Sequence, residues 1–502
     1  MNANLYALFE SRFPEDKTAC AIETHDGLFY TWGDLERATA KMANLLASLK
    51  LPKDSRIAVQ VEKSPEALVL YLATIRAGYI YLPLNTAYRA AEIEYFIENA
   101  KPAVVVCSPK NFGWVSQVAF KTGTRHVFTL GENRDGSLLE RSIPQRDTFE
   151  TVQREADDLA AILYTSGTTG RSKGAMLTHE NLASNARVLH EYWNWQAGDV
   201  LLHALPLFHV HGLFVASHGA LLNGSKMIFL PKFDAAEVMK HMPRATVFMG
   251  VPTYYVRLVA EPSFDRAACA NMRLFVSGSA PLLLDTFNEF VQRTGHTILE
   301  RYGMSETTML VSNPYEGERI GGTVGMPLPG VSVRVVNGDG APCGVDEIGD
   351  IQVQGPNVFK GYWRMPEKTA EEFTPDGYFK TGDVGRFDAR GYLSIVGRSK
   401  DLIISGGYNV YPKEIESFID ELDGVVESAV IGVPHPDFGE AVSAVVVVKP
   451  EAAITEADVI GTLKTKIANF KVPKRVFFVQ DLPRNTMGKV QKNVLRDLFK
   501  DG

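Results

Sequence analysis

The stretch that decides the fold reads Tyr164-Thr-Ser-Gly-Thr-Thr-Gly-Arg-Ser-Lys-Gly174. It follows an apolar run, LAAIL, which predicts a buried strand, and it precedes a predicted helix that begins near His179. Glycines and hydroxyls let backbone N–H groups, side-chain O–H groups and Lys173 converge on a polyphosphate. A plain polar turn explains this density of glycine, hydroxyl and lysine poorly. The loop is not a Walker A motif, which needs glycine at Ser172 and a hydroxyl at Gly174.

Outside this loop, short β-branched runs alternate with helical patterns through most of the chain. The runs include RIAVQV, AVVVC, TVFMGVP and RLFVSGS, and one helical pattern covers residues 64–77. This alternation predicts an α/β fold with largely parallel sheets. Near Asp383 the pattern changes to Gly-rich segments that are typical of antiparallel strands.

A smaller unit is predicted after Lys400. Its expected order is a Gly-rich loop, a helix from Pro412, the strands ESAVIGV and VSAVVVV, a helix over residues 457–470, and the strand RVFFV. This order is typical of a compact α+β domain of ordinary size. We therefore predict two domains, residues 1–399 and residues 400–502.

Composition excludes several classes of protein. With 45% hydrophobic and 22% charged residues among 502, the chain is typical of globular proteins. A net charge of −7 argues against binding nucleic acid or an anionic membrane through the whole surface. Four cysteines without CxxC spacing suggest neither zinc nor disulfides, and no secretion signal or spanning segment is visible, so we expect a cytoplasmic location.

Seven further motifs stand along the chain. They are Phe208-His-Val-His-Gly212, Val276-Ser-Gly-Ser-Ala280, Glu300-Arg-Tyr-Gly-Met-Ser-Glu306, Tyr378-Phe-Lys-Thr-Gly-Asp383, Gly397-Arg-Ser-Lys-Asp401, Gly406-Gly-Tyr-Asn409 and Pro483-Arg-Asn-Thr-Met-Gly-Lys489. Together with the first loop, they resemble the adenylate-forming superfamily, which contains acyl-CoA synthetases, peptide-synthetase adenylation domains and beetle luciferases. The resemblance implies a large N-terminal domain of layered α/β subdomains with a β-barrel-like part, and a small mobile C-terminal domain.

The resemblance also implies ATP, Mg²⁺ and coenzyme A as ligands. Tyr302 matches the aromatic residue that stacks on adenine, and Asp383 with Arg398 matches the pair that holds the ribose hydroxyls. Glu306, with Thr165, matches the residues at Mg²⁺, a hard ion suited to oxygen ligands. The full set expected at the nucleotide is Thr165, Ser166, Gly167, Thr168, Thr169, Lys173, Ser277, Gly278, Ser279, Ala280, Glu300, Arg301, Tyr302, Gly303, Met304, Ser305, Asp383 and Arg398.

Catalysis is expected to depend on a lysine near the C-terminus. Forming an acyl adenylate brings a carboxylate onto the α-phosphate, so cations must neutralise the shifting charge. Lys489 matches the family's catalytic lysine, and acylation of this side chain is an expected form of regulation. Lys400 matches the hinge between the domains. Ser405, Gly406 and Gly407 match the loop that lines the pantetheine tunnel for coenzyme A.

The acid is harder to read than the nucleotide. The segments GRSKGAMLTH, PLFHVHGL and SGSAPL resemble malonyl-CoA synthetases in particular. In that subfamily an arginine, a serine and a histidine contact the distal carboxylate, which implies Arg257, Ser279 and the catalytic-site His209 here. A buried second carboxylate requires such a cation. From the residues alone, Arg257 on a helix is equally well read as a solvated arginine.

Other functions remain open at this point. Another short or aryl carboxylic acid would use the same nucleotide motifs, and methylmalonate differs from malonate by one methyl group. A free-standing enzyme that loads a carrier protein would share the first half-reaction. A luciferase-like oxidoreductase shares the fold, but a charged pocket suits an aromatic acid poorly. A catalytically silent nucleotide sensor is disfavoured by intact Lys489, Glu306 and Asp383.

Overall fold

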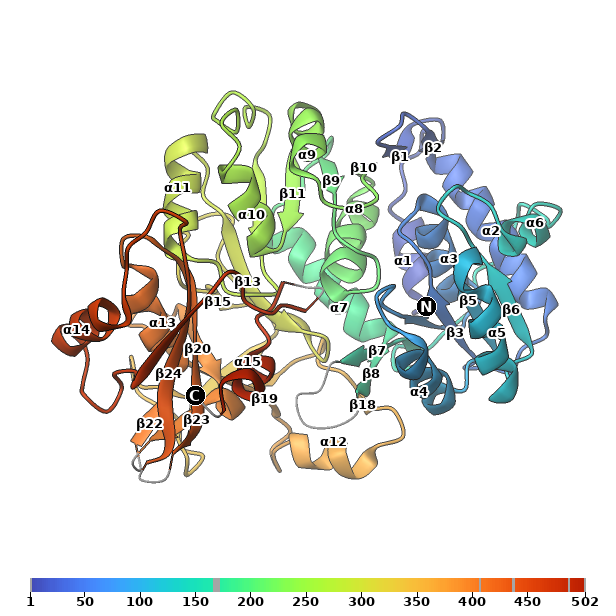
Figure 1. Cartoon of the computed structure of the whole chain (residues 1–502). Helices are drawn as coiled ribbons and strands as arrows, with labels where there is room; N and C mark the ends of the chain where they lie inside the picture. Colours follow the sequence, from blue (N-terminus) through green and yellow to red (C-terminus); the bar gives the residue numbers. More distant parts are fainter. Residues whose placement is uncertain (1, 166–171, 406–407, 436–437, 486–487, 501–502) are drawn as a thin grey trace. The chain divides into compact units, whose positions relative to one another are not determined.

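The computed structural model describes residues 2–165, 172–405, 408–435, 438–485 and 488–500. It forms two compact units, shown in Figure 1: residues 1–332 with 354–373, and residues 333–353 with 374–502. Residues 333–353 and 374–399, which we expected in the N-terminal domain, thus group with the C-terminal unit. This grouping of residues does not test the position of a hinge, so the hinge at Lys400 stays a prediction.

The first unit contains a seven-stranded sheet. Its strands are β3 (Arg56–Gln60), β4 (Ile80–Pro83), β5 (Val104–Cys107), β6 (His126–Thr129), β7 (Leu159–Thr165), β8 (Lys173–Thr178) and β18 (Gly361–Tyr362), in the order β18-β8-β7-β4-β3-β5-β6. The pairs from β7 through β6 are parallel, whereas β8 is antiparallel to both β7 and β18. The parallel part confirms the sequence pattern.

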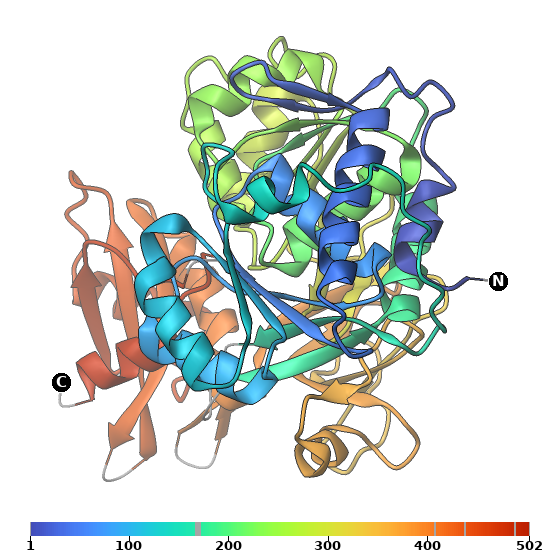
Figure 2. The same ribbon diagram turned by 90° about the vertical axis from the view of Figure 1, so that its right-hand side faces the viewer.

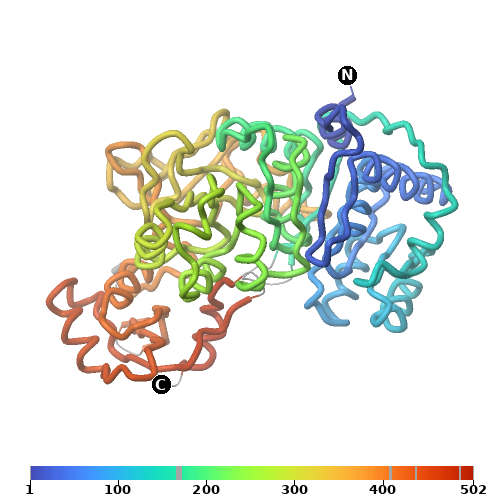
Figure 3. Tube along the Cα trace, turned by 90° about the horizontal axis from the view of Figure 1, so that it is seen from above, coloured from blue at the N-terminus to red at the C-terminus, as the bar shows by residue number. Residues whose placement is uncertain are grey.

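A nine-stranded sheet completes the β-structure of this unit. Its strands are β1 (Cys20–Thr24), β2 (Phe29–Thr31), β9 (Val200–His203), β10 (Lys226–Phe229), β11 (Val247–Gly250), β12 (Leu274–Ser277), β13 (Leu299–Met304), β14 (Thr308–Ser312) and β15 (Met326–Pro327), in the order β15-β14-β13-β12-β11-β9-β10-β1-β2. Strand β1 pairs in parallel with β10, so residues close to the N-terminus lie beside residues 226–229 (Figure 3). The pairs from β9 to β13 are also parallel.

Helices lie between and outside these sheets. They are α1 (Leu5–Glu10), α2 (Trp32–Ser48), α3 (Pro65–Arg76), α4 (Ala90–Ala100), α5 (Phe112–Lys121), α6 (Ser137–Ser142), α7 (His179–Tyr192), α8 (His218–Asn223), α9 (Ala235–His241), α10 (Pro252–Val259), α11 (Leu284–Thr294) and α12 (Pro366–Glu372), with short 3₁₀ segments η1 (Pro109–Asn111) and η3 (Met242–Arg244) and a π-helical segment η2 (His211–Ser217). Every residue of α3 is buried, as expected of a helix covered on all sides. Helix α7 contacts β8 of one sheet and β14 of the other, so it lies between them.

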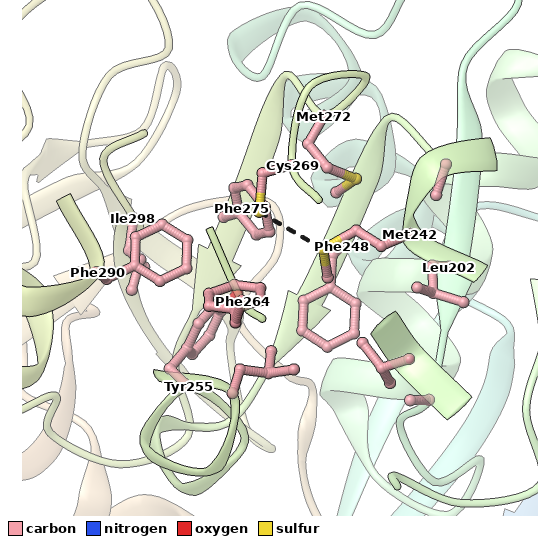
Figure 4. Packing of buried hydrophobic residues seen from close by; sticks show 14 of the residues in the cluster. Leu202, Met242, Phe248, Tyr255, Phe264, Cys269, Met272, Phe275, Phe290 and Ile298 are labelled. Carbon is pink, nitrogen blue, oxygen red and sulfur yellow. Dashed lines mark hydrogen bonds between the residues drawn. The ribbon is translucent and has the colours of Figure 1, made fainter. Parts of the chain in front are cut away.

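The outer faces of both sheets are covered by helices. Helices α4 and α5 lie against the seven-stranded sheet (Figure 2). They pack on it through a cluster that includes Ile93, Phe96 and Val115. Helices α9 to α11 cover the nine-stranded sheet in the same way (Figure 4). There Phe275 of β12 meets Phe290 of α11 edge to face, with 4.9 Å between ring centroids. Strands β12 and β13 carry parts of the motifs Val276–Ala280 and Glu300–Glu306.

The second unit contains two sheets. Strands β16 (Ser332–Val336), β17 (Gly349–Gln354), β19 (Phe379–Phe387) and β20 (Leu393–Arg398) form a four-stranded sheet that corresponds to the expected β-barrel-like part. After the 3₁₀ turn η4 (Ser399–Asp401) come β21 (Ile403–Ser405), β22 (Tyr408–Val410), α13 (Pro412–Asp420), β23 (Val425–His435), β24 (Gly439–Val448), α14 (Glu456–Lys466), β25 (Arg475–Val479) and α15 (Lys492–Phe499).

The strand order of the second sheet is β22-β21-β24-β23, with β25 beside β24, and its central strand β24 is buried on both faces. Side chains of β24 alternate: Val442 and Val446 join a cluster with α13 and α14, whereas Val445 joins one with Leu495 of α15. The order of helices and strands predicted after Lys400 is confirmed. The helix expected over residues 457–470 ends earlier, at Lys466. Among the described residues, no helix of either unit is long and apolar enough to cross a membrane.

Candidate active site

The signature loop lies inside a β-hairpin. Strands β7 and β8 flank it, and Thr165 stands opposite Lys173 in the antiparallel register. The hydroxyl of Thr165 donates to the carbonyl of Lys173 over 3.4 Å. Strand β8 therefore separates the loop from helix α7, which begins at His179 as predicted. The predicted phosphate contacts Ser166, Gly167, Thr168 and Thr169 lie outside the described residues.

Lys173 is held by a segment that the sequence motifs did not point to. Its Nζ lies 3.3 Å from Oε1 of Glu372, at the end of α12. The same ammonium lies 4.3 Å from the ring centroid of Tyr362, in the range of a cation–π contact. Glu372 and Tyr362 thus both contact the ammonium of Lys173.

Glu306, the expected Mg²⁺ ligand, is buried with only 6% of its surface exposed. Its Oε1 accepts a hydrogen bond of 3.0 Å from the hydroxyl of Tyr362, and its carbonyl accepts one of 2.7 Å from the N–H of Phe359. Among the described residues, no cluster of three His, Cys, Asp or Glu side chains forms an all-protein metal cage. One oriented carboxylate fits Mg²⁺, which usually takes one or two carboxylates plus phosphates and water.

The ends of β12 and β13 carry the other motifs. Ser277 closes β12, and Ser279 has a left-handed backbone with φ of +76°, a strained conformation for a residue with a side chain. A Cβ at Gly278 would lie 2.3 Å from Nη1 of Arg301, so only glycine allows the guanidinium to approach this turn. Ala280, half-buried, follows directly.

Arg301 is the most unusual charge of the site. It is 4% exposed, and its Nε and Nη2 have no hydrogen-bond partner in the described part of the chain. Desolvation lowers the pKa of this guanidinium to about 9. The described residues place no carboxylate within ion-pair distance of Arg301, and a buried cation without a counter-ion is costly, which points to a ligand that supplies the negative charge.

The two histidines of the FHVHG motif differ in burial and in their contacts. His211 begins the π-helical segment η2, a form often found at functional sites, and it is 1% exposed. Its Nδ1 lies 3.4 Å from Oγ of Ser279, and its Nε2 has no partner among the described residues. Burial and the charge of Arg301 hold the pKa of His211 well below its ordinary value, so it is neutral. His209 is half-buried, and its Nδ1 accepts a hydrogen bond from the backbone N–H of His211.

The remaining nucleotide candidates of the first unit lie along the hairpin of β13 and β14. Glu300 is buried, and its Oε1 accepts a hydrogen bond from the N–H of Gly322 over 3.3 Å. A Cβ at Gly303 would lie 2.0 Å from the carbonyl oxygen of Thr308, so the chain requires glycine where the register shifts. The residues with half-buried side chains beside it are Tyr302, Met304 and Ser305.

Arg257 differs from this buried group in its exposure. On α10, Tyr255 and Leu258 face the core, whereas Arg257 is exposed to solvent. Burial raises the pKa of Tyr254 to about 12, and the nearby charge of Arg257 acts in the opposite direction. The predicted contact between Arg257 and the distal carboxylate stays a prediction.

Other predicted residues belong to the second unit. Asp383 and Arg398 stand directly opposite each other on β19 and β20, and Arg398 Nε lies 3.1 Å from Asp383 Oδ1. The backbone N–H of Lys489 donates to Oδ1 of Asn485 over 3.0 Å. Lys400 lies in the turn η4, and Ser405 ends β21 in a buried position. Gly406 and Gly407 lie outside the described residues.

Comparison with known proteins identifies the family. The sequence profile of the AMP-binding enzyme family matches residues 9–363, and that of the AMP-binding enzyme C-terminal domain matches residues 414–489. The chain belongs to the AMP-binding enzyme family. The adenylate-forming resemblance drawn from the motifs is thereby confirmed.

Relatives of this AMP-binding enzyme include CoA ligases of different acids. A crystal structure of ATP-bound MatB from Rhodopseudomonas palustris is similar with a TM-score of 0.98 and 56% identity, covering 100% of this chain and 99% of that one. A malonate–CoA ligase of Arabidopsis thaliana is 35% identical over 99% of this chain and 89% of its own length. A feruloyl-CoA synthase of an Amycolatopsis species is 34% identical over 95% of both chains.

The Asp383 pair of this AMP-binding enzyme allows a direct test of ribose binding. Replacing Asp383 with asparagine should raise the KM for ATP about tenfold, because a neutral amide accepts the two hydroxyl protons of a diol less well. The KM for the acid should change little. Asp376→Asn is the matched control, since Asp376 pairs with Arg334 in the same unit and is exposed. Equal KM values for ATP in both variants would contradict the assignment.

Proposed function

We propose that this AMP-binding enzyme is a malonate–CoA ligase. It joins malonate to the α-phosphate of ATP with release of diphosphate, and it then transfers the malonyl group to coenzyme A with release of AMP. The observation that supports the choice of a diacid is Arg301, a buried guanidinium with two N–H groups unpartnered among the described residues.

The family resemblance placed Arg301 at the nucleotide and Arg257 at the distal carboxylate. We propose instead that the second carboxylate pairs with Arg301, because this guanidinium is the buried one. One carboxylate of malonate must reach the α-phosphate, and the other requires a cation wherever it is buried. Ionised oxygen against guanidinium gives hydrogen bonds about twice as strong as neutral ones. His211 and Ser279 lie beside Arg301 and supply further polar groups. An acid with only one carboxylate would leave Arg301 unpaired, so the pocket selects against it.

We place the predicted residues in the first half-reaction as follows. Lys173 and the hydroxyl of Thr165 bind the phosphates, and Glu306 holds Mg²⁺, which when bound neutralises phosphate charge. Tyr302 lies against adenine, while Asp383 and Arg398 hold the ribose. Lys489 donates hydrogen bonds to the carboxylate and the α-phosphate as negative charge moves onto the leaving diphosphate.

The second half-reaction uses the smaller domain in another position. We propose that Lys400 absorbs the rotation and that Ser405, Gly406 and Gly407 then line the tunnel for the thiol arm, because glycines leave room close to the backbone. Lys489 withdraws in this step. We also propose that acylation of Lys489 stops the first step in the cell, and that the enzyme works in the cytoplasm, where its four free cysteines stay reduced.

An acid panel tests the proposal. AMP formation would be measured with ATP, coenzyme A and malonate, methylmalonate, acetate or ferulate in turn. The kcat/KM for malonate should exceed that for acetate by at least about a hundredfold, because acetate leaves the buried cation unpaired. A carrier protein in place of coenzyme A should give no thioester. Preference for ferulate would instead favour an aryl-CoA ligase, and preference for the carrier protein a loading enzyme.

A further inference from the structure

Tyr362 touches both charges that the proposed function assigns to ATP and its metal. Its hydroxyl donates to Oε1 of Glu306 over 3.0 Å, and the ammonium of Lys173 lies over its ring, 4.3 Å from the centroid. Resting on the proposed function, we infer that Tyr362 is a positioning residue that fixes the metal-binding carboxylate and the phosphate-binding ammonium relative to each other. Neither Glu306 nor Lys173 would then need to be ordered by the substrate.

The ring of Tyr362 is itself tightly held. Tyr362 is 3% exposed, and strand β18 pairs it with Ala175 of β8, two residues after Lys173. Its N–H donates to Oγ1 of Thr369 over 2.9 Å, which anchors the strand to α12. Its ring meets that of Phe359 edge to face at 4.8 Å. A residue held on every side in this way can transmit a fixed geometry to the groups that it touches.

The hydroxyl of Tyr362 donates to the metal-binding carboxylate from a buried position. By occupying one carboxylate oxygen of Glu306, it leaves the carboxylate with a defined orientation for a metal ion.

Lys173 is held from the same segment by a second group. Glu372, ten residues after Tyr362, forms an ion pair with Lys173, and 3.3 Å separate Nζ from Oε1. The ammonium of Lys368, on the same helix as Glu372, lies 3.2 Å from the same carboxylate oxygen. The carboxylate of Glu372 competes with incoming phosphates for Lys173. Tyr362 and Glu372 thus act on Lys173 in different ways: the ring positions the ammonium, whereas Glu372 neutralises it until ATP binds.

Two binding measurements separate these roles. Mn²⁺ affinity would be measured by electron paramagnetic resonance in the presence of a non-hydrolysable ATP analogue, and affinity for the same analogue in EDTA by calorimetry. Tyr362→Phe keeps the ring and removes the hydroxyl, so Mn²⁺ should bind about five- to tenfold more weakly. The affinity in EDTA should stay within about twofold. Glu372→Gln should bind the analogue in EDTA about threefold more tightly, since a competing charge is removed.

The control is another buried tyrosine. Tyr6→Phe loses a hydroxyl that lies 3.1 Å from Thr39 Oγ1, away from the signature loop, and should leave Mn²⁺ affinity unchanged. In the Glu306→Gln background, Tyr362→Phe should cause no further loss of Mn²⁺ affinity, because the tyrosine acts through that carboxylate. These measurements contain no acid, so they stand or fall independently of the choice of malonate.

The inference would be overturned by either of two results. In the first, Tyr362→Phe binds Mn²⁺ within about twofold of the unsubstituted enzyme. In the second, the loss is not specific to the metal site, which would show a general structural role. Tyr362→Phe would then weaken analogue binding in EDTA as much as Mn²⁺ binding, or would lower Mn²⁺ affinity equally in the Glu306 and Glu306→Gln backgrounds.

Discussion

Replacing Lys489 with alanine is expected to reduce adenylate formation by at least about 10²- to 10³-fold, the usual cost of removing a donor to transition-state charge. Thioester formation from supplied malonyl adenylate should stay within about threefold of the unsubstituted enzyme, because the lysine takes no part in that step. The first step would be followed by exchange of labelled diphosphate into ATP, and the second by malonyl-CoA formation.

Two hydrogen bonds of Lys489 use its backbone atoms and do not depend on its side chain. The N–H of Lys489 donates to Asn485 Oδ1, and its carbonyl accepts from the N–H of Asn485 over 2.9 Å, so backbone atoms close the loop. Alanine keeps both contacts. Lys464→Ala, at an exposed position of α14, is the matched control and should affect neither step. Lys489→Gln, which resembles acetyl-lysine, should behave like the alanine variant. Equal loss of both steps would contradict the assigned division of labour.

The fold followed from the sequence where local patterns and burial agree. The β-branched runs became β3, β5, β11 and β12, and residues 64–77 became α3 with Ser64 as its N-cap. After Lys400, the pattern predicted α13, β23, β24, α14 and β25, and the run of apolar residues in β24 made that strand easy to recognise. It did not predict the short strands β21 and β22 or the helix α15. The grouping of residues 333–353 with the second unit depends on contacts between distant strands, which no local pattern reports.

The site was predicted less completely. The motifs pointed to Glu306 and Lys173, but Tyr362 and Glu372, which hold them, lie between the motif that ends at Glu306 and the one that begins at Tyr378. Arg301 was expected at the nucleotide, and its burial without a partner depends on how the ends of β12 and β13 pack. A charged residue inside a strand gives no sign in the sequence of whether it is solvated.

The most diagnostic substitution for the acid is Arg301→Met. Malonate kcat/KM should fall by about 10³-fold, because the distal carboxylate would be buried without a cation, whereas acetate kcat/KM should change less than tenfold. The apo variant should be at least as stable as the unsubstituted enzyme, since an apolar side chain replaces a desolvated charge. Kinetics with both acids and the thermal midpoint of unfolding measure the two effects.

Two further variants decide between the arginines. Gly278→Ala should reduce malonate use in the same selective way, because its Cβ would displace Nη1 of Arg301, whereas Gly113→Ala, with open space around it, should not. Arg257→Met, at an exposed position, should cost malonate less than Arg301→Met does. If Arg257→Met instead causes the larger malonate-specific loss, the distal carboxylate lies at α10. If Arg301→Met unfolds more easily and loses both acids equally, its guanidinium is structural, and the argument for a diacid loses its physical basis.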